Sequence, residues 1–106
     1  VATTIAPTMA EGTAIAQPIR LREVLSTLRE TRGGAVTLTE QEIANATLDL
    51  ARTGVYVEPT SAQAAAAFGK LLQTGTITRE QTTVLVMTGT GLKATPRVAG
   101  LLGIAL

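Results

Sequence analysis

The sequence predicts an α/β fold, with a partial parallel sheet and flanking helices, in a single unit of residues 1–106. Two observations support this class. Stretches with the apolar period of a helix alternate with short extended runs, an order that favours a parallel sheet. The run Thr83–Met87 is nearly all apolar, which is typical of a strand covered on both faces.

The composition excludes several classes of function. The 106 residues include no His and no Cys, so zinc fingers, thiol nucleophiles, disulfides and Ser-His-Asp triads are excluded. The net charge of +1 gives no electrostatic footprint for nucleic acid. No apolar run reaches the roughly 18 residues that suggest a membrane span, and the lack of cysteine fits a reducing compartment. We therefore expect a cytoplasmic protein without nucleic-acid or membrane partners.

The chain is predicted to begin with an irregular segment that is followed by a helix. Residues 1–19 are expected to be irregular, because proline and glycine interrupt them without any periodic pattern. A helix is predicted over residues 21–31, and the pair Gly33–Gly34 stops it. Its apolar residues lie at i, i+3, i+4 and i+7, on one face: Leu21, Val24, Leu25 and Leu28.

A short extended run, Ala35–Leu38, precedes a second predicted helix. Thr39 and Glu42 form the Thr-x-x-Glu pattern of a capping box, in which each side chain bonds the backbone N–H of the other residue. Gly54 is the expected stop of this helix. Its predicted buried face consists of Ile43, Ala46, Leu50 and Ala51.

The second half repeats this alternation. Val55–Val57 is a short extended run, and Thr60 is predicted to cap an alanine-rich helix that ends near Gln73. Residues Thr78–Gln81 are expected to form a capped turn. After the apolar strand, Thr95–Leu102 is predicted to be a short helix with threonine as its cap and proline at its first position.

The strongest candidate site follows the apolar strand, which runs directly into Thr88, Gly89, Thr90 and Gly91. In open α/β sheets, ligands bind just beyond the carboxyl ends of the strands. The glycines allow close approach of the backbone to a ligand, and the hydroxyls supply neutral donors and acceptors. The alternative is a tight turn after a buried strand.

Two further segments and two lysines have functional and structural interpretations. In Glu58–Ala62 the Glu58 carboxylate lies just outside a helix N-terminus, which suits either a site or a capping arrangement alone. Ala10–Ala14 is either a loop against a site or an irregular lead-in. Lys70 and Lys93 could each form a Schiff base. For Lys70, on the polar side of its helix, a solvated charge is the preferred interpretation.

Taken in order, several segments carry a family resemblance. They are Ala10–Ala16, Pro18–Arg20, Gly33–Val36, Gly54–Ala62 and Val84–Lys93. Together they resemble the C-terminal part of threonine synthase, a pyridoxal-phosphate enzyme of the tryptophan synthase β type (fold type II). No single segment is specific, but the ordered set, which covers most of the chain, is.

The resemblance implies the cofactor pyridoxal phosphate and the conversion of O-phosphohomoserine and water to threonine and phosphate. It implies that the Thr88 hydroxyl bonds the pyridine nitrogen, which leaves that nitrogen less protonated than an aspartate would. Gly89, Thr90 and Gly91 would close around the ring edge, and Glu58 resembles a carboxylate near the ring. The Thr-Gly-x-Gly-Leu-Lys ending favours threonine synthase over threonine dehydratase. No catalytic residue and no metal ligand is assigned in this chain.

Two departures from the family pattern limit the prediction. The family's Ser-x-Lys-Asp segment, with the lysine that holds the cofactor, and its phosphate loop rich in glycine and asparagine are absent, and the one asparagine is Asn45. We therefore expect a C-terminal fragment of a larger catalytic domain, inactive alone, whose parent takes an amino-acid substrate and forms a homo-oligomer. The alternatives are a small α/β amino-acid-binding or regulatory module, a structural or oligomerisation domain, and another fold type II enzyme such as threonine dehydratase.

Overall fold

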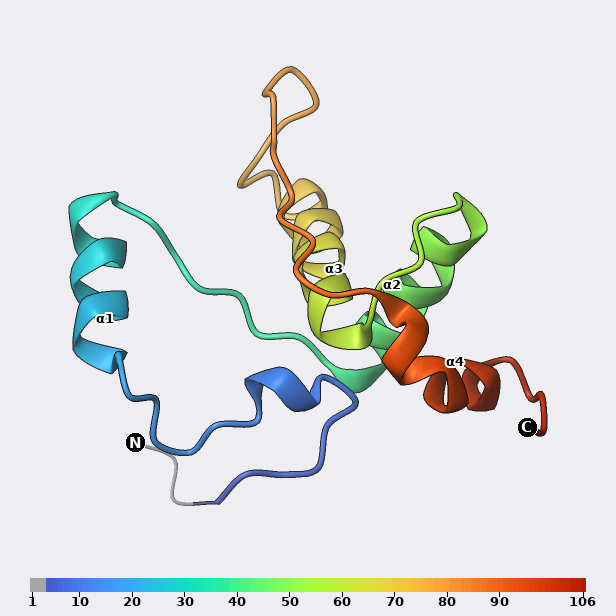
Figure 1. The fold of residues 1–106 in the computed structure, drawn as a ribbon. Coiled ribbons are helices and arrows are strands. Elements are labelled where there is room, and N and C mark those ends of the chain that lie inside the picture. The colour runs from blue at the N-terminus through green and yellow to red at the C-terminus, as the bar shows by residue number, and fades with distance from the viewer. Residues whose placement is uncertain (1–3) are drawn as a thin grey trace.

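The computed structural model describes residues 4–106, which form helices joined by long extended segments (Figure 1). The elements in chain order are η1 (Glu11–Thr13), α1 (Leu21–Glu30), α2 (Glu40–Arg52), α3 (Pro59–Gln73), η2 (Gly91–Ala94) and α4 (Thr95–Leu101). Helices α2 and α3 pack against each other, and α4 packs against α2. Helix α1 stands apart from this group, and residues 31–39 lead from it to α2 as an extended strap (Figure 1).

The core is small and lies where η1, α2, α3 and α4 meet. Most of its side chains are alanine or valine, which lets the helices approach closely but buries little area for each residue. The buried apolar residues are Ala10, Ile43, Ala44, Val57, Ala62, Val98 and Ala99. None of them belongs to α1, so the packed part of the chain is the half that contains α2, α3 and α4.

The capping box predicted for α2 is confirmed. Thr39 Oγ1 accepts a hydrogen bond from the Glu42 backbone N–H at 3.2 Å, and a Glu42 carboxylate oxygen accepts one from the Thr39 N–H at 2.6 Å. The predicted turn at Thr78 is confirmed in the same way, since the side-chain oxygen of Gln81 accepts from the Thr78 N–H at 2.8 Å. Both motifs involve residues three apart, so the local sequence is enough to form them.

The predicted cap of α3 was wrong. The helix begins at Pro59, and Glu58 occupies the N-cap position without a side-chain cap bond. Proline suits this first position because it has no N–H to satisfy and its φ is already helical. The Thr60 hydroxyl instead accepts a hydrogen bond from Gly12 N at 3.1 Å. Helix α4 begins similarly, with Thr95 inside its first turn rather than capping it.

The expected parallel sheet does not form within residues 4–106. The backbone of 83–87 is extended but unpaired, and Val84 and Val86 are 81% and 69% exposed. The one isolated bridge in this part of the chain is antiparallel and joins Val57 to Thr90. The apolar pattern of a strand indicates that it is to be covered, but pairing also requires a neighbouring strand, and residues 4–106 do not supply one.

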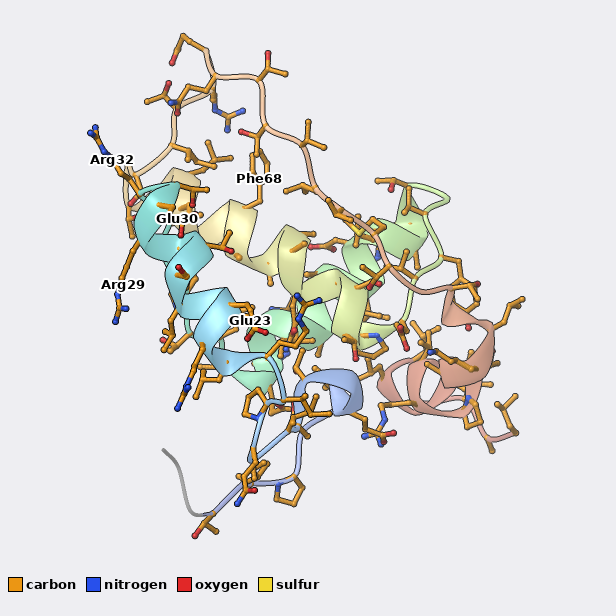
Figure 2. The ribbon with its side chains drawn as sticks, turned by 60° about the vertical axis from the view of Figure 1, so that its left-hand side comes forward. Glu23, Arg29, Glu30, Arg32 and Phe68 are labelled. Atoms are coloured by element: carbon orange, nitrogen blue, oxygen red, sulfur yellow. The ribbon has the colours of Figure 1, made fainter. Side chains whose placement is uncertain are left out.

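Two stretches, which we call the open segments, are α1 and residues 76–87. The apolar side chains of Leu21, Val24 and Leu25 on α1 are exposed. Figure 2 shows charged side chains such as Arg29 pointing away from the same helix. The radius of gyration is 15.0 Å, against about 13 Å for a compact domain of this length. The molecule therefore exposes apolar surface that a globular domain would bury.

Residues 4–106 contain neither a membrane-spanning helix nor a cluster of metal ligands. No helix there combines the length and apolar character that crossing a membrane requires. Nor do three or more His, Cys, Asp or Glu side chains gather there as ligands for a metal ion.

Candidate functional site

Three segments far apart in the sequence meet at the N-terminus of α3. We call this region the α3 junction, and it comprises residues 10–13, 56–62 and 88–91. On one side, Gly12 N bonds the Thr60 hydroxyl. On the other, Glu58 N donates to the Gly89 carbonyl oxygen at 3.1 Å. The junction thus brings together the segments that sequence analysis selected as candidate sites.

Backbone pairing fixes the loop after the unpaired strand. The antiparallel bridge between Val57 and Thr90 is flanked by two hydrogen bonds, Glu58 N to Gly89 O and Gly91 N to Tyr56 O, each 3.1 Å long. This pattern is that of a non-hydrogen-bonded antiparallel pair, whose Cα atoms approach closely. The chain that follows the strand is therefore held against the chain that precedes α3.

Ser61 is the polar centre of the junction, and sequence analysis did not single it out. It lies in the first turn of α3 and is 2% exposed. Its Oγ accepts hydrogen bonds from Thr88 N at 2.9 Å and Gly89 N at 2.7 Å, and lies 2.9 Å from Thr88 Oγ1. A serine just after a helix-starting proline suggests a capping hydroxyl, whereas its actual partners lie 27 and 28 residues later.

The two glycines of the loop are required by side chains of this chain. A Cβ on Gly89 would lie 1.9 Å from Glu58 Oε1, and a Cβ on Gly91 would lie 2.8 Å from the ring of Tyr56. Such distances are well inside van der Waals contact. Within this chain, the side chains of Glu58 and Tyr56 occupy the space beside these glycines, and the predicted approach to a ligand stays a prediction.

The polar side chains around the loop are mutually paired. Glu58 is 17% exposed and forms an ion pair with Lys93 at 3.0 Å. The Tyr56 hydroxyl lies 2.9 Å from Thr95 Oγ1. The Thr90 hydroxyl accepts from the Leu92 N–H at 3.4 Å, as the cap of η2. Thr88 belongs to the exposed part of the junction.

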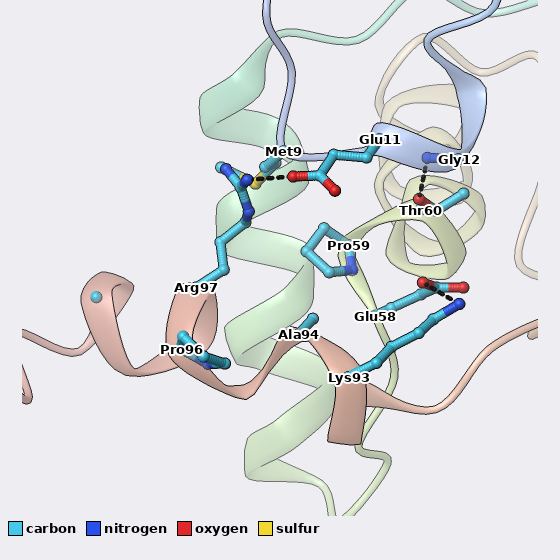
Figure 3. A pocket seen from close by; sticks show the side chains of 11 residues that line it. Met9, Glu11, Gly12, Glu58, Pro59, Thr60, Lys93, Ala94, Pro96 and Arg97 are labelled. Atoms are coloured by element: carbon cyan, nitrogen blue, oxygen red, sulfur yellow. Dashed lines mark hydrogen bonds and ion pairs between the residues drawn. The ribbon is translucent and has the colours of Figure 1, made fainter. Parts of the chain in front are cut away.

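An open pocket of about 860 Å³ lies beside the junction (Figure 3). The Glu58–Lys93 ion pair lies on one side of it, and Arg97, paired with Glu11, lies on the other. Of the predicted site residues, Glu58 lines this pocket. The other four, Thr88, Gly89, Thr90 and Gly91, do not line it. The structure brings all five together at the α3 junction, with Glu58 before α3 and the other four in the loop that pairs with it.

Lys70 is not the solvated charge that sequence analysis favoured. Its Nζ donates to the Thr37 carbonyl oxygen at 2.9 Å and lies 3.0 Å from Glu42 Oε1. The backbone N–H of Thr39 and, after it, the Lys70 ammonium lower the pKa of Glu42. Lys70 thus ties α3 to the strap and to the capping box of α2, away from the α3 junction.

The comparisons with known proteins show the family to which the chain belongs. Residues 1–89 match the family model described as pyridoxal-phosphate dependent enzyme. The chain belongs to this family. It is 41% identical to a threonine synthase of Methanosarcina acetivorans and 38% identical to one of Methanocaldococcus jannaschii, in each case over 87 residues and 81% of this chain. The resemblance to threonine synthase is confirmed.

The same comparisons show how much of each relative this chain covers. It spans 22% of the length of each of these two relatives. No solved structure matches it.

Proposed function

We propose that this chain is the C-terminal part of a threonine synthase, the lyase that converts O-phosphohomoserine and water to threonine and phosphate. The observation that carries the proposal is the identity of 41% and 38% to two threonine synthases over 81% of the chain. The substrate is accordingly a small phosphorylated amino acid. The homo-oligomeric state and the cytoplasmic location expected from the sequence are part of the same proposal.

The missing sheet follows from this assignment. We place residues 35–38 and 83–87 as strands of a parallel sheet whose other strands belong to the remainder of the catalytic domain. The support is the mismatch between an apolar run and its surroundings, since Val84 and Val86 are mostly exposed in the present chain. A parallel sheet buries both faces of its strands, which would remove this exposure.

We assign the cofactor ring to the exposed edge of the α3 junction, with Thr88, Gly89, Thr90, Gly91 and Glu58 around it. Bound pyridoxal phosphate supplies an electron sink for carbanions of amino acids. The Thr88 hydroxyl suits the acceptor nitrogen of a pyridine ring, because it is a neutral donor at the exposed end of a fixed loop. Glu58 is held in place by Lys93, so its carboxylate has a defined position beside the loop.

The residues of the α3 junction fit the ring edge of the cofactor. They fit no other part of it. The sequence contains no Ser-x-Lys-Asp segment and no loop rich in glycine and asparagine, and both lysines are occupied by carboxylates, Lys70 by Glu42 and Lys93 by Glu58. The covalent anchor and the phosphate site therefore belong to the rest of the enzyme. Residues 1–106 alone are expected to be inactive.

The test uses the full-length protein that carries this chain, supplied with pyridoxal phosphate and O-phosphohomoserine. Threonine and phosphate should form in equal amounts. Thr88→Val should lower kcat by roughly tenfold, the effect of losing a hydrogen bond of about 1.4 kcal/mol in the transition state, and should lower stability by a smaller amount, through the lost contact with Ser61 Oγ. Thr82→Val, also at an exposed threonine, is the matched control.

Three results would contradict parts of this proposal. No threonine from O-phosphohomoserine, together with 2-oxobutyrate from threonine, would assign the protein to threonine dehydratase. Equal losses of activity and stability in Thr88→Val would make Thr88 a structural residue. Turnover by residues 1–106 alone would overturn the assignment of the anchor to another part of the enzyme.

A further inference from the structure

The hydrogen bonds of Ser61 fix the direction of a proton. A serine hydroxyl offers two acceptor sites and one donor. Both acceptor sites of Ser61 Oγ are used, because the N–H groups of Thr88 and Gly89 point at it from 2.9 and 2.7 Å. A backbone N–H can only donate, so these two assignments carry no ambiguity.

The remaining proton of Ser61 then has one partner within reach. Thr88 Oγ1 lies 2.9 Å away, and Ser61 is too deeply buried for its hydroxyl to turn to solvent. The reverse direction, with Thr88 donating, would give the Ser61 oxygen a third donor. It would also leave the Ser61 proton buried without a partner, an arrangement that folded proteins avoid. Ser61 therefore donates and Thr88 accepts.

This direction leaves the Thr88 proton for a partner outside the loop. A hydroxyl that already accepts one hydrogen bond is polarised into a better donor and a poorer acceptor. The N-terminus of α3, where Ser61 lies, adds a partial positive charge that disfavours a second cation nearby. Both effects select a partner with a free lone pair over one that carries a proton.

We propose that Ser61 is a positioning residue that commits the Thr88 hydroxyl to donating to an unprotonated aromatic nitrogen. The proposal rests on the proposed function, because the nitrogen is that of the pyridoxal-phosphate ring. Ser61 touches neither the ring nor the substrate, and acts through Thr88. It also holds the Thr88 and Gly89 backbone, so the donor is fixed in both position and direction.

The experiment follows the ring nitrogen itself. The full-length protein is loaded with pyridoxal phosphate labelled with ¹⁵N in the ring, and the ¹⁵N chemical shift is measured in the wild type and five variants. Ser61→Ala and Thr88→Val should move the shift in the same direction, and the double variant should move it no further than Thr88→Val. Ser61→Thr, which keeps a hydroxyl, should restore the wild-type shift.

Thr47→Val is the matched control for the loss of a buried hydroxyl. Thr47 is as buried as Ser61, and its hydroxyl donates to the Ile43 carbonyl oxygen at 2.8 Å, in α2. This variant should lose stability and leave the ring shift unchanged. In steady-state kinetics, Ser61→Ala should lower kcat about tenfold in the wild-type background and much less in Thr88→Val, since coupled residues are not additive.

Several outcomes would overturn the proposal. They are an unchanged ring shift in Ser61→Ala, equal effects of that variant with and without the Thr88 hydroxyl, or a shift of the same size in Thr47→Val. If Ser61→Ala does not fold, Ser61→Cys replaces it, because a thiol keeps the shape but is a weak donor. A wild type that binds the cofactor and makes no threonine refutes the proposed function alone, whereas one that binds no cofactor refutes both.

Discussion

The α3 junction and the open segments have opposite surroundings. At the junction, Ser61 is buried and its hydroxyl has three partners. In the open segments, Leu21, Val24 and Val86 are exposed. The contrast teaches that a polar network can be complete within one piece of a chain, whereas apolar faces depend on what covers them.

The largest predicted effect concerns the open segments. Val86→Asp in the full-length protein should lower the free energy of unfolding by about 3 kcal/mol or more, because a carboxylate would be buried in the proposed sheet. Chemical denaturation and soluble yield measure this effect. Thr82→Asp, just before residues 83–87, should change stability by less than about 0.5 kcal/mol. Equal, small effects of both would show that residues 76–87 face solvent in the whole protein.

The next effect compares two glycines with opposite expectations, one in the junction and one in α3 outside it. Gly91→Ala should destabilise by about 1–3 kcal/mol, because its Cβ would lie 2.8 Å from the Tyr56 ring. Gly69→Ala, in the middle of α3 with nothing within 4 Å of its Cβ, should stabilise by about 0.5–1 kcal/mol. Thermal unfolding of the two variants compares them directly. If Gly91→Ala left thermal stability unchanged, Tyr56 would have to move aside without a cost in stability.

A smaller effect is expected where the packed half meets the strap. Lys70→Met should cost about 0.2–1 kcal/mol, the usual value of a partly exposed ion pair. Amide hydrogen exchange in residues 35–39 should become faster, since Lys70 also holds the Thr37 carbonyl oxygen. Arg52→Met removes an exposed pair within α2, with Asp49, and should leave that exchange unchanged. Identical exchange in both variants would count against a tie between α3 and the strap.

The smallest effect is a response to acid. The Thr8 hydroxyl and, after it, the Met9 N–H hold the pKa of Glu40 below its ordinary value of 4.5. Such a carboxylate stabilises the fold above its unfolded pKa, and the contribution is lost as the pH falls through the lower, folded value. Below about pH 4.5, NMR signals of residues 8 and 9 should therefore shift toward those of Glu40→Gln. Glu40→Gln itself should show no such transition, and a transition that persists in it belongs to another group.

The sequence allowed prediction of whatever depends on neighbours a few residues apart. The capping box at Thr39 and the turn at Thr78 were right because both bonds span three residues. The start of α3 was wrong because the hydroxyl of Thr60 is used by Gly12, 48 residues earlier in the chain. Lys70 was misjudged for the same reason, since its partners lie in another helix and in the strap.

The sheet and the candidate site differ in outcome. The apolar pattern of Thr83–Met87 predicts a covered strand, which was wrong for residues 4–106, because Val84 and Val86 are exposed there and no neighbouring strand pairs with the run. The candidate site stays a prediction; it rests on the hydroxyls and glycines that follow that run, and the structure places Gly89 beside Glu58. Ser61 was missed, because no local pattern marks a serine whose partners are 27 and 28 residues away.

The separation of 27 residues between Ser61 and Thr88 also affects the order in which the junction forms during synthesis. Synthesis runs from the N-terminus at roughly 5–20 residues per second, so Thr88 follows Ser61 by roughly one to five seconds. During that interval α3 can form, but the acceptor sites of the Ser61 hydroxyl lack the two N–H groups that fill them in the finished fold. The Thr88 hydroxyl is therefore fixed against Ser61 only after α3 has been synthesised.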